Sequence, residues 1–131
     1  MHCTITAIYT ALTAFLFIVL AYRVVQFRQK FNAGIGDKGD RAFNVAIRTH
    51  ANLVENAPIT LLLMLLAENL GAWPWFLHLS GIIFVVSRIA HAWGMTKALG
   101  NYSKYRFFGV VGSWLVLLAL ALFDLVAALI R

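Results

Sequence analysis

The sequence predicts an all-α integral membrane protein in which one domain, residues 1–131, is a bundle of four transmembrane helices. Of its 131 residues, 62% are hydrophobic and 12% are charged, and the mean hydropathy is +0.81. Soluble domains carry about 25% charged residues, so this composition excludes that class. A spanning helix needs about 20 mostly apolar residues. Four stretches have that length with at most one charged residue each, at 3–22, 49–67, 69–87 and 107–130.

Each helix is bounded by local signals. The first is expected over about 4–30 as a retained helix, because its apolar run is too long for a cleaved signal peptide. The second, over about 43–70, follows a glycine-rich loop and ends before Gly71. The third, over about 74–97, opens with Pro74, which is favoured at the first position of a helix. The fourth is expected over about 104–129.

The basic residues predict the orientation. Ten of the eleven Lys and Arg residues lie in 23–48 and 88–106, and the turn between the second and third helices has none. The positive-inside rule therefore places the first and third connections in the cytoplasm and both termini outside. Trp73 and Trp75 fit an aromatic belt on the outer side. Topology and contact with membrane lipid account for the net charge of +6, and we expect no nucleic acid partner.

A polar stripe interrupts the second apolar stretch. Arg48, Asn52 and Glu55 are four and then three residues apart, so they lie within roughly 40° of one another on a helix. Counted from Gly71, Glu55 lies about 24 Å inward, in the cytoplasmic third of a core about 30 Å thick. A charge at the middle of a spanning helix costs about 2.5–3.5 kcal/mol. The stripe should therefore face protein or a wet cleft.

Three more arginines reach the same level, namely Arg28, Arg88 and Arg106. One interpretation is structural: Glu55 pairs with Arg48 or Arg88 and fixes the helix register. This leaves a surplus of cations at that depth, which favours an anionic ligand. The acidic residues of the first loop would neutralise part of the surplus if that loop folds inward.

Three segments resemble one known superfamily, the membrane-associated proteins in eicosanoid and glutathione metabolism (MAPEG). They are "RTHANLVENAP" at 48–58, "SRIAHAWG" at 87–94 and "RFFG" at 106–109. The resemblance covers nearly the whole chain. Within the superfamily, the chain is most similar to the short bacterial members. It implies a homotrimer of four-helix subunits in the bacterial inner membrane. Glutathione, the co-substrate, would bind between adjacent subunits, on the cytoplasmic side.

The resemblance also assigns roles to individual residues. Arg106 matches the arginine that stabilises the glutathione thiolate and is the catalytic candidate. Glu55 would hold the amino group of glutathione, and Arg28 would pair with a carboxylate, with Arg23 as a rival. No metal is implied. The full set of glutathione-binding candidates is Arg28, Arg48, His50, Asn52, Glu55, Arg88 and His91.

The role of Arg106 is chemically sound. A thiol with a pKa near 8.5 is mostly protonated at pH 7, and a nearby guanidinium favours the nucleophilic thiolate. Arginine does not deprotonate in proteins, so its role is electrostatic. The implied activity is that of a glutathione-dependent transferase or peroxidase, acting on a hydrophobic electrophile or a lipid hydroperoxide that enters from the bilayer.

Three positions depart from the better-studied members. Met95 and Val110 stand where several carry tyrosines, and Ala51 stands where some carry an arginine. Tyr102 and Tyr105 lie near enough in sequence to substitute. Two other functions stay open at this point: a non-catalytic membrane protein whose polar stripe serves structure or binds lipid head groups, and a small transporter.

Overall fold

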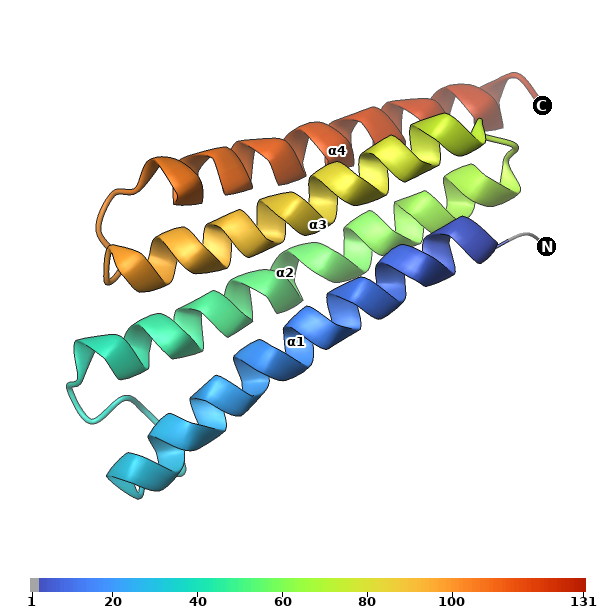
Figure 1. Ribbon diagram of the computed structural model, residues 1–131. Coiled ribbons are helices and arrows are strands. Elements are labelled where there is room, and N and C mark those ends of the chain that lie inside the picture. The colour runs from blue at the N-terminus through green and yellow to red at the C-terminus, as the bar shows by residue number, and fades with distance from the viewer. Residues whose placement is uncertain (1–2) are drawn as a thin grey trace.

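The computed structural model describes residues 3–131, which form four α-helices and no strand. Their bounds are Thr4–Phe31 for α1, Arg41–Asn69 for α2, Pro74–Lys97 for α3 and Lys104–Leu129 for α4 (Figure 1). Each bound lies within two residues of the range predicted from the sequence. All four helices are long and apolar enough to cross a membrane.

Consecutive helices run in opposite directions, so the connections alternate between the two ends of the bundle. The α2–α3 connection lies at the end where α1 begins and α4 finishes (Figure 1). The connections over residues 32–40 and 98–103 lie together at the other end, which we call the basic end because the two groups of basic residues flank it. The topology thus brings together two loops that are separated in sequence by the whole of α2 and α3.

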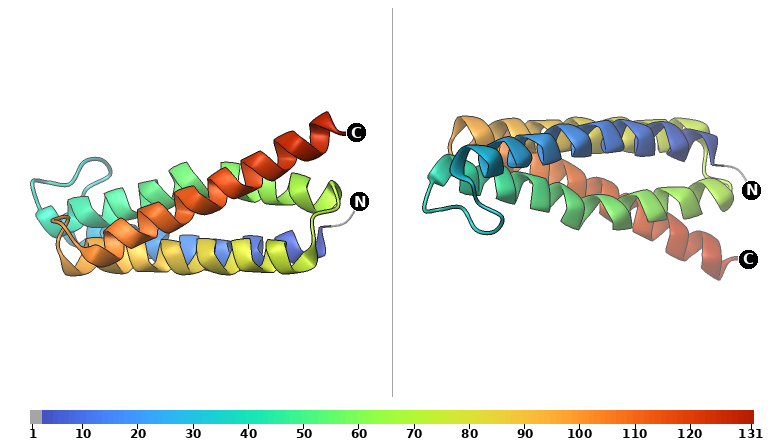
Figure 2. Two further views of the ribbon diagram at one scale, coloured as in Figure 1. Left: turned by 90° about the horizontal axis from the view of Figure 1, so that it is seen from above. Right: turned by 90° about the horizontal axis from the view of Figure 1, so that it is seen from below.

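Glycines allow α3 and α4 to approach closely. A Cβ atom built on Gly109 would lie 2.6 Å from the carbonyl oxygen of Ser87 and 2.7 Å from the amide nitrogen of His91. Small residues at such crossings let helix backbones pack against each other in membranes. From this contact α4 runs obliquely across the other helices (Figure 2). The most deeply buried large side chains are Phe43, Phe84, Met64, Leu77 and Leu120.

Side chains also fix the helix ends. Asp40 caps α2 by accepting a hydrogen bond from the Phe43 amide at 2.8 Å. At the end opposite the basic end, the Glu68 carboxylate accepts from the Ile5 and Thr6 amides at 2.9 and 2.8 Å. These are amides of the first turn of α1, which a carboxylate stabilises. The start of α1 is therefore held against the last turn of α2.

Candidate functional site

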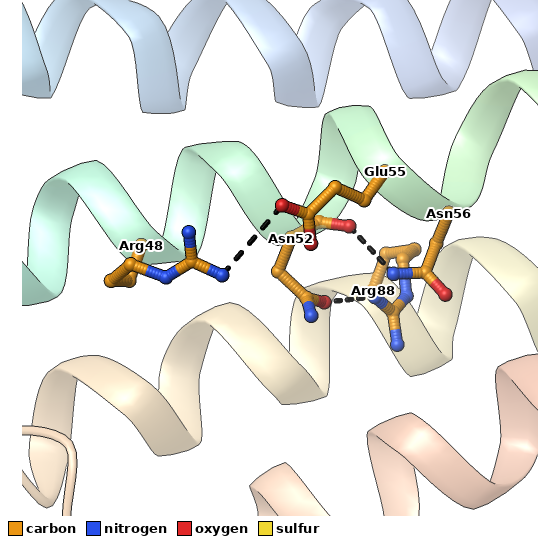
Figure 3. A network of polar contacts seen from close by, with 5 residues as sticks. All are labelled: Arg48, Asn52, Glu55, Asn56 and Arg88. Atoms are coloured by element: carbon orange, nitrogen blue, oxygen red, sulfur yellow. Dashed lines mark hydrogen bonds and ion pairs between the residues drawn. The ribbon is translucent and has the colours of Figure 1, made fainter.

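Arg88 connects three helices from inside the bundle. Its Nη1 donates to Asn52 Oδ1 of α2 at 2.5 Å, and Figure 3 shows this contact. Its Nε donates to Ser113 Oγ at 2.8 Å and its Nη2 to the Gly109 carbonyl at 3.0 Å, both on α4. Only 3% of the residue is exposed. Of the two pairings considered for Glu55, the one with Arg88 is not formed, because Arg88 donates to three neutral oxygens instead.

The carboxylate of Glu55 pairs with Arg48 instead. Arg48 Nη2 lies 3.6 Å from Glu55 Oε1, as Figure 3 shows. The two side chains are 54% and 57% exposed on the single chain. This part of the predicted ion-pair network is therefore present, and it lies on the surface of α2 rather than inside the bundle.

A pocket of about 470 Å³ opens at the basic end. It lies between the first loop, the start of α2, the end of α3 and the start of α4. Its charged lining residues are Asp37, Asp40, Arg41, Arg48 and Arg106. Two of the predicted site arginines, from helices far apart in sequence, thus share one pocket. The first loop does lie against it, as an inward fold requires.

The carboxylates of the first loop are already engaged. Asp37 Oδ1 accepts from the Gly39 amide at 2.9 Å, and Oδ2 accepts from Asn44 Nδ2 at 2.7 Å. These two hydrogen bonds lower the pKa of Asp37, so its carboxylate stays ionised at neutral pH. Asp40 caps α2. Both acidic side chains therefore hold the loop against α2.

Arg106 lies at the junction of two pockets. Its Nη1 donates to the Gly100 carbonyl at 3.0 Å, and the residue is half-buried. Besides the polar pocket, it lines a mostly apolar one of about 240 Å³, together with Tyr102, Ser103, Phe107 and Val110. A charged group here has a polar space on one side and an apolar space on the other.

Gly94 sets the position of the Arg106 backbone. A Cβ atom on Gly94 would collide with the Arg106 backbone nitrogen. We expect Gly94→Ala to push the start of α4 away from α3 and to cost about 1–3 kcal/mol of stability, as overpacking does. Thermal unfolding in detergent, followed by circular dichroism, measures the effect. Gly34→Ala is the matched control, because nothing lies within 4 Å of its Cβ position. Equal melting temperatures for the two variants would contradict the close contact.

The two candidate arginines of α1, Arg23 and Arg28, are not among the residues that line the pocket at the basic end. Arg28 Nη1 lies 3.4 Å from the carbonyl oxygens of Ala33 and Gly36, and its guanidinium stands 5.5 Å from the centroid of the Phe43 ring. It lines a separate shallow pocket of about 300 Å³. The rival, Arg23, donates to Thr96 Oγ1 at 2.7 Å. Within residues 3–131 of one chain, neither arginine shares the pocket at the basic end with Arg106.

The two candidate histidines differ in burial: His50 is partly buried between α1 and α2, whereas His91 is buried inside the bundle. The His50 ring lies 4.8 Å from the Phe17 ring of α1, centroid to centroid. His50 follows Arg48 by two residues, so it points to nearly the opposite side of α2. His91 is 4% exposed and lies where α3 meets Gly109 of α4. Neither histidine is among the residues that line the pocket at the basic end.

Arg41 is a residue of the pocket that the sequence analysis missed. Its Nε donates to the Leu99 carbonyl at 2.6 Å, and its Nη2 donates to Asn101 Oδ1 at 2.8 Å. The sequence analysis counted Arg41 only among the basic residues at 23–48. One signal was available: Arg41 precedes Arg48 by seven residues, which is two turns on the same face.

Comparisons with known proteins agree with the fold and with the motifs. The family model described as "MAPEG family" matches residues 6–126. The chain is 34% identical over 121 residues to "Inner membrane protein YecN" of Escherichia coli strain K12, a match that covers 92% of this chain and 90% of the relative. The protein of the same name in E. coli O6:H1 strain CFT073 matches with the same identity and coverage.

Proposed function

Because the chain belongs to the MAPEG family, we propose that it is a membrane-bound glutathione-dependent transferase or peroxidase. It is a multi-pass protein of the bacterial inner membrane. One observation carries the proposal: Arg48 and Arg106 line the same pocket at the basic end. Glutathione carries two carboxylates and one ammonium group, so it needs cationic partners. The volume of about 470 Å³ suits a small ligand.

The site residues divide into ligand contacts and supports. Arg48 takes a carboxylate of glutathione, and Glu55, paired with Arg48 at 3.6 Å, takes its ammonium group. Arg106 faces the sulfur. Arg88 is buried and holds Asn52, so we assign it to fixing the polar stripe between α2 and α4. By their packing, His50 and His91 are assigned to the same supporting role.

The exposed charges of α2 support an oligomer. Charges that face lipid at this depth are costly, yet the Arg48 and Glu55 side chains are more than half exposed on the single chain. A neighbouring subunit that covers this face removes the cost. We therefore propose the homotrimer of the family, in which Arg28 reaches glutathione from a neighbouring subunit. The positive-inside rule puts the basic end in the cytoplasm.

The chemistry then follows from the thiolate. With Arg106 stabilising the sulfur anion, the sulfur attacks an electrophilic carbon and displaces its leaving group with the bonding pair. With a lipid hydroperoxide, the sulfur attacks the O–O bond, which gives an alcohol after protonation and the sulfenic acid of glutathione. A second glutathione converts that acid to the disulfide and water. The apolar substrate fits the small pocket of Tyr102, Phe107 and Val110, beside Arg106.

An activity assay in proteoliposomes tests the proposal. Two reactions are assayed: glutathione conjugation of an apolar aryl halide, and glutathione-dependent reduction of a fatty acid hydroperoxide. The protein is expected to accelerate at least one of them. The rate should saturate in glutathione, because the site is a pocket with charged partners. Empty liposomes give the background. Rates at that background for both substrates, with folded protein present, would contradict the enzyme proposal.

A non-catalytic membrane protein of the same fold is the second candidate. The hydrogen bonds of Arg88 favour it, because they use Asn52 of the polar stripe for structure. On this alternative the Arg106→Ala protein keeps its full biological role, whereas variants of Arg88 lose it through unfolding. Complementation of a deletion strain by Arg106→Ala separates the candidates, because the enzyme proposal predicts that this variant fails, whereas Arg88 variants should fail on both.

A further inference from the structure

The two loops of the basic end are joined by one side chain. Arg41 begins α2, and its guanidinium reaches across to the α3–α4 connection. There it donates two hydrogen bonds, to the Leu99 carbonyl at 2.6 Å and to Asn101 Oδ1 at 2.8 Å. The planar guanidinium holds its donors in a fixed geometry. Hydrogen bonds to two acceptors therefore fix the orientation of the guanidinium, and they also fix the two acceptors relative to each other.

The segment that Arg41 holds has an unusual backbone. Leu99 has φ of 47° and Gly100 has φ of 81°, both in the left-handed region. A left-handed leucine is uncommon and persists only where surrounding contacts enforce it. The hydrogen bond from Arg41 to the Leu99 carbonyl is such a contact. The Gly100 amide also closes the end of α3 by donating to the Met95 carbonyl at 3.1 Å.

The same segment orients Arg106. The carbonyl of Gly100, next to the peptide that Arg41 holds, accepts from Arg106 Nη1 at 3.0 Å. A chain of contacts thus leads from Arg41 through Leu99 and Gly100 to the Arg106 guanidinium. Arg41, Leu99, Gly100 and Arg106 all line the same pocket of about 470 Å³.

We propose that Arg41 is a positioning residue for the thiolate-stabilising guanidinium, because it holds the α3–α4 connection in the conformation that orients Arg106. The inference rests on the proposed function. Arg41 acts through the loop, so its effect depends on its hydrogen bonds to the two acceptors and is not reproduced by its charge alone. If the Arg41 side chain is removed, the loop is no longer held. The Gly100 carbonyl then shifts, and the Arg106 guanidinium loses its fixed orientation toward the sulfur.

The test is the thiolate absorbance of glutathione bound to purified, detergent-solubilised protein, titrated with pH and divided by the bound glutathione measured by equilibrium dialysis. We expect Arg41→Ala to lower the thiolate yield per bound glutathione at pH 7 by about three- to tenfold, the range for one or two hydrogen bonds. Asn101→Ala removes an acceptor without changing any charge and should act in the same direction. Arg41→Lys keeps the charge but not the fork, and should restore the yield only in part.

Lys38→Gln is the matched control, since it removes an exposed cation of the neighbouring loop and should leave the yield unchanged. Wild-type yields in both Arg41→Ala and Asn101→Ala would overturn the inference while leaving the proposed function intact. A wild-type yield in Asn101→Ala and Arg41→Lys, with a loss in Arg41→Ala alone, would also overturn it by showing a direct effect of charge. Absence of the thiolate signal from the wild-type protein would overturn the proposed function and the inference together.

Discussion

Replacing Arg88 by alanine is expected to destabilise the protein by at least about 3 kcal/mol, because it removes three hydrogen bonds between helices and opens a cavity. Three acceptors each lose a donor: Asn52 Oδ1, Ser113 Oγ and the Gly109 carbonyl. In a membrane no water replaces the missing donors. The change should lower the free energy of unfolding. This free energy is measured by adding increasing amounts of a denaturing detergent to the protein in mild detergent micelles.

Ile89→Ala is the control for Arg88→Ala. It truncates the next residue of α3, which is 52% exposed, so its effect should stay below about 1 kcal/mol. Arg88→Met tests the cause, because it fills much of the volume but donates no hydrogen bond. It should recover the part of the loss that comes from the cavity. An Arg88→Ala protein as stable as the Ile89→Ala protein would show that Arg88 does not join the three helices.

The largest effect on activity is expected from Arg106→Ala. Removing one group that stabilises a developing or resting anion typically lowers the rate by about 10²–10³-fold. The loss should depend on pH. Without the guanidinium, the thiol pKa returns toward about 8.5, so the conjugation rate should rise roughly tenfold per pH unit between 6.5 and 8. The wild-type rate should change far less over that range if, as proposed, Arg106 keeps the bound thiol ionised.

Arg106→Lys is the informative companion variant. It retains a positive charge near the sulfur but not the planar fork that the Gly100 carbonyl orients, so its rate should fall between those of the wild type and Arg106→Ala. The melting temperatures of all three proteins should be similar, because Arg106 is only half-buried. Parallel pH–rate profiles for the wild type and Arg106→Ala would contradict the assigned role.

The helices were predictable because a membrane imposes a simple rule on sequence. Every spanning helix needs an uninterrupted apolar length, and Gly71 and Pro74 mark the turn between the second and third. The polar stripe of α2 was predictable for a similar reason, because Arg48 and Glu55 share a face through the helical period. Both predictions depend on residues close together in sequence.

The partners of Arg88 and Arg106 depend on contacts between distant segments and could not be predicted. Arg88 binds Ser113 and the Gly109 carbonyl of α4, and Arg106 binds the Gly100 carbonyl. Every residue has a backbone carbonyl, so the sequence does not indicate which carbonyl an arginine will contact. The sequence therefore left Arg88 as one of two possible partners for Glu55, whereas the packing of α3 on α4 supplies it with neutral acceptors.

The most direct test of a glutathione-activating site is ultraviolet thiolate absorbance on adding glutathione to purified, detergent-solubilised protein at pH 7. The signal reports the anion itself, before any second substrate is known. The account predicts a saturable thiolate signal for the wild type that is lost in Arg106→Ala, although the variant remains folded. No signal from folded wild-type protein at millimolar glutathione, or an equal signal from the two proteins, would contradict it.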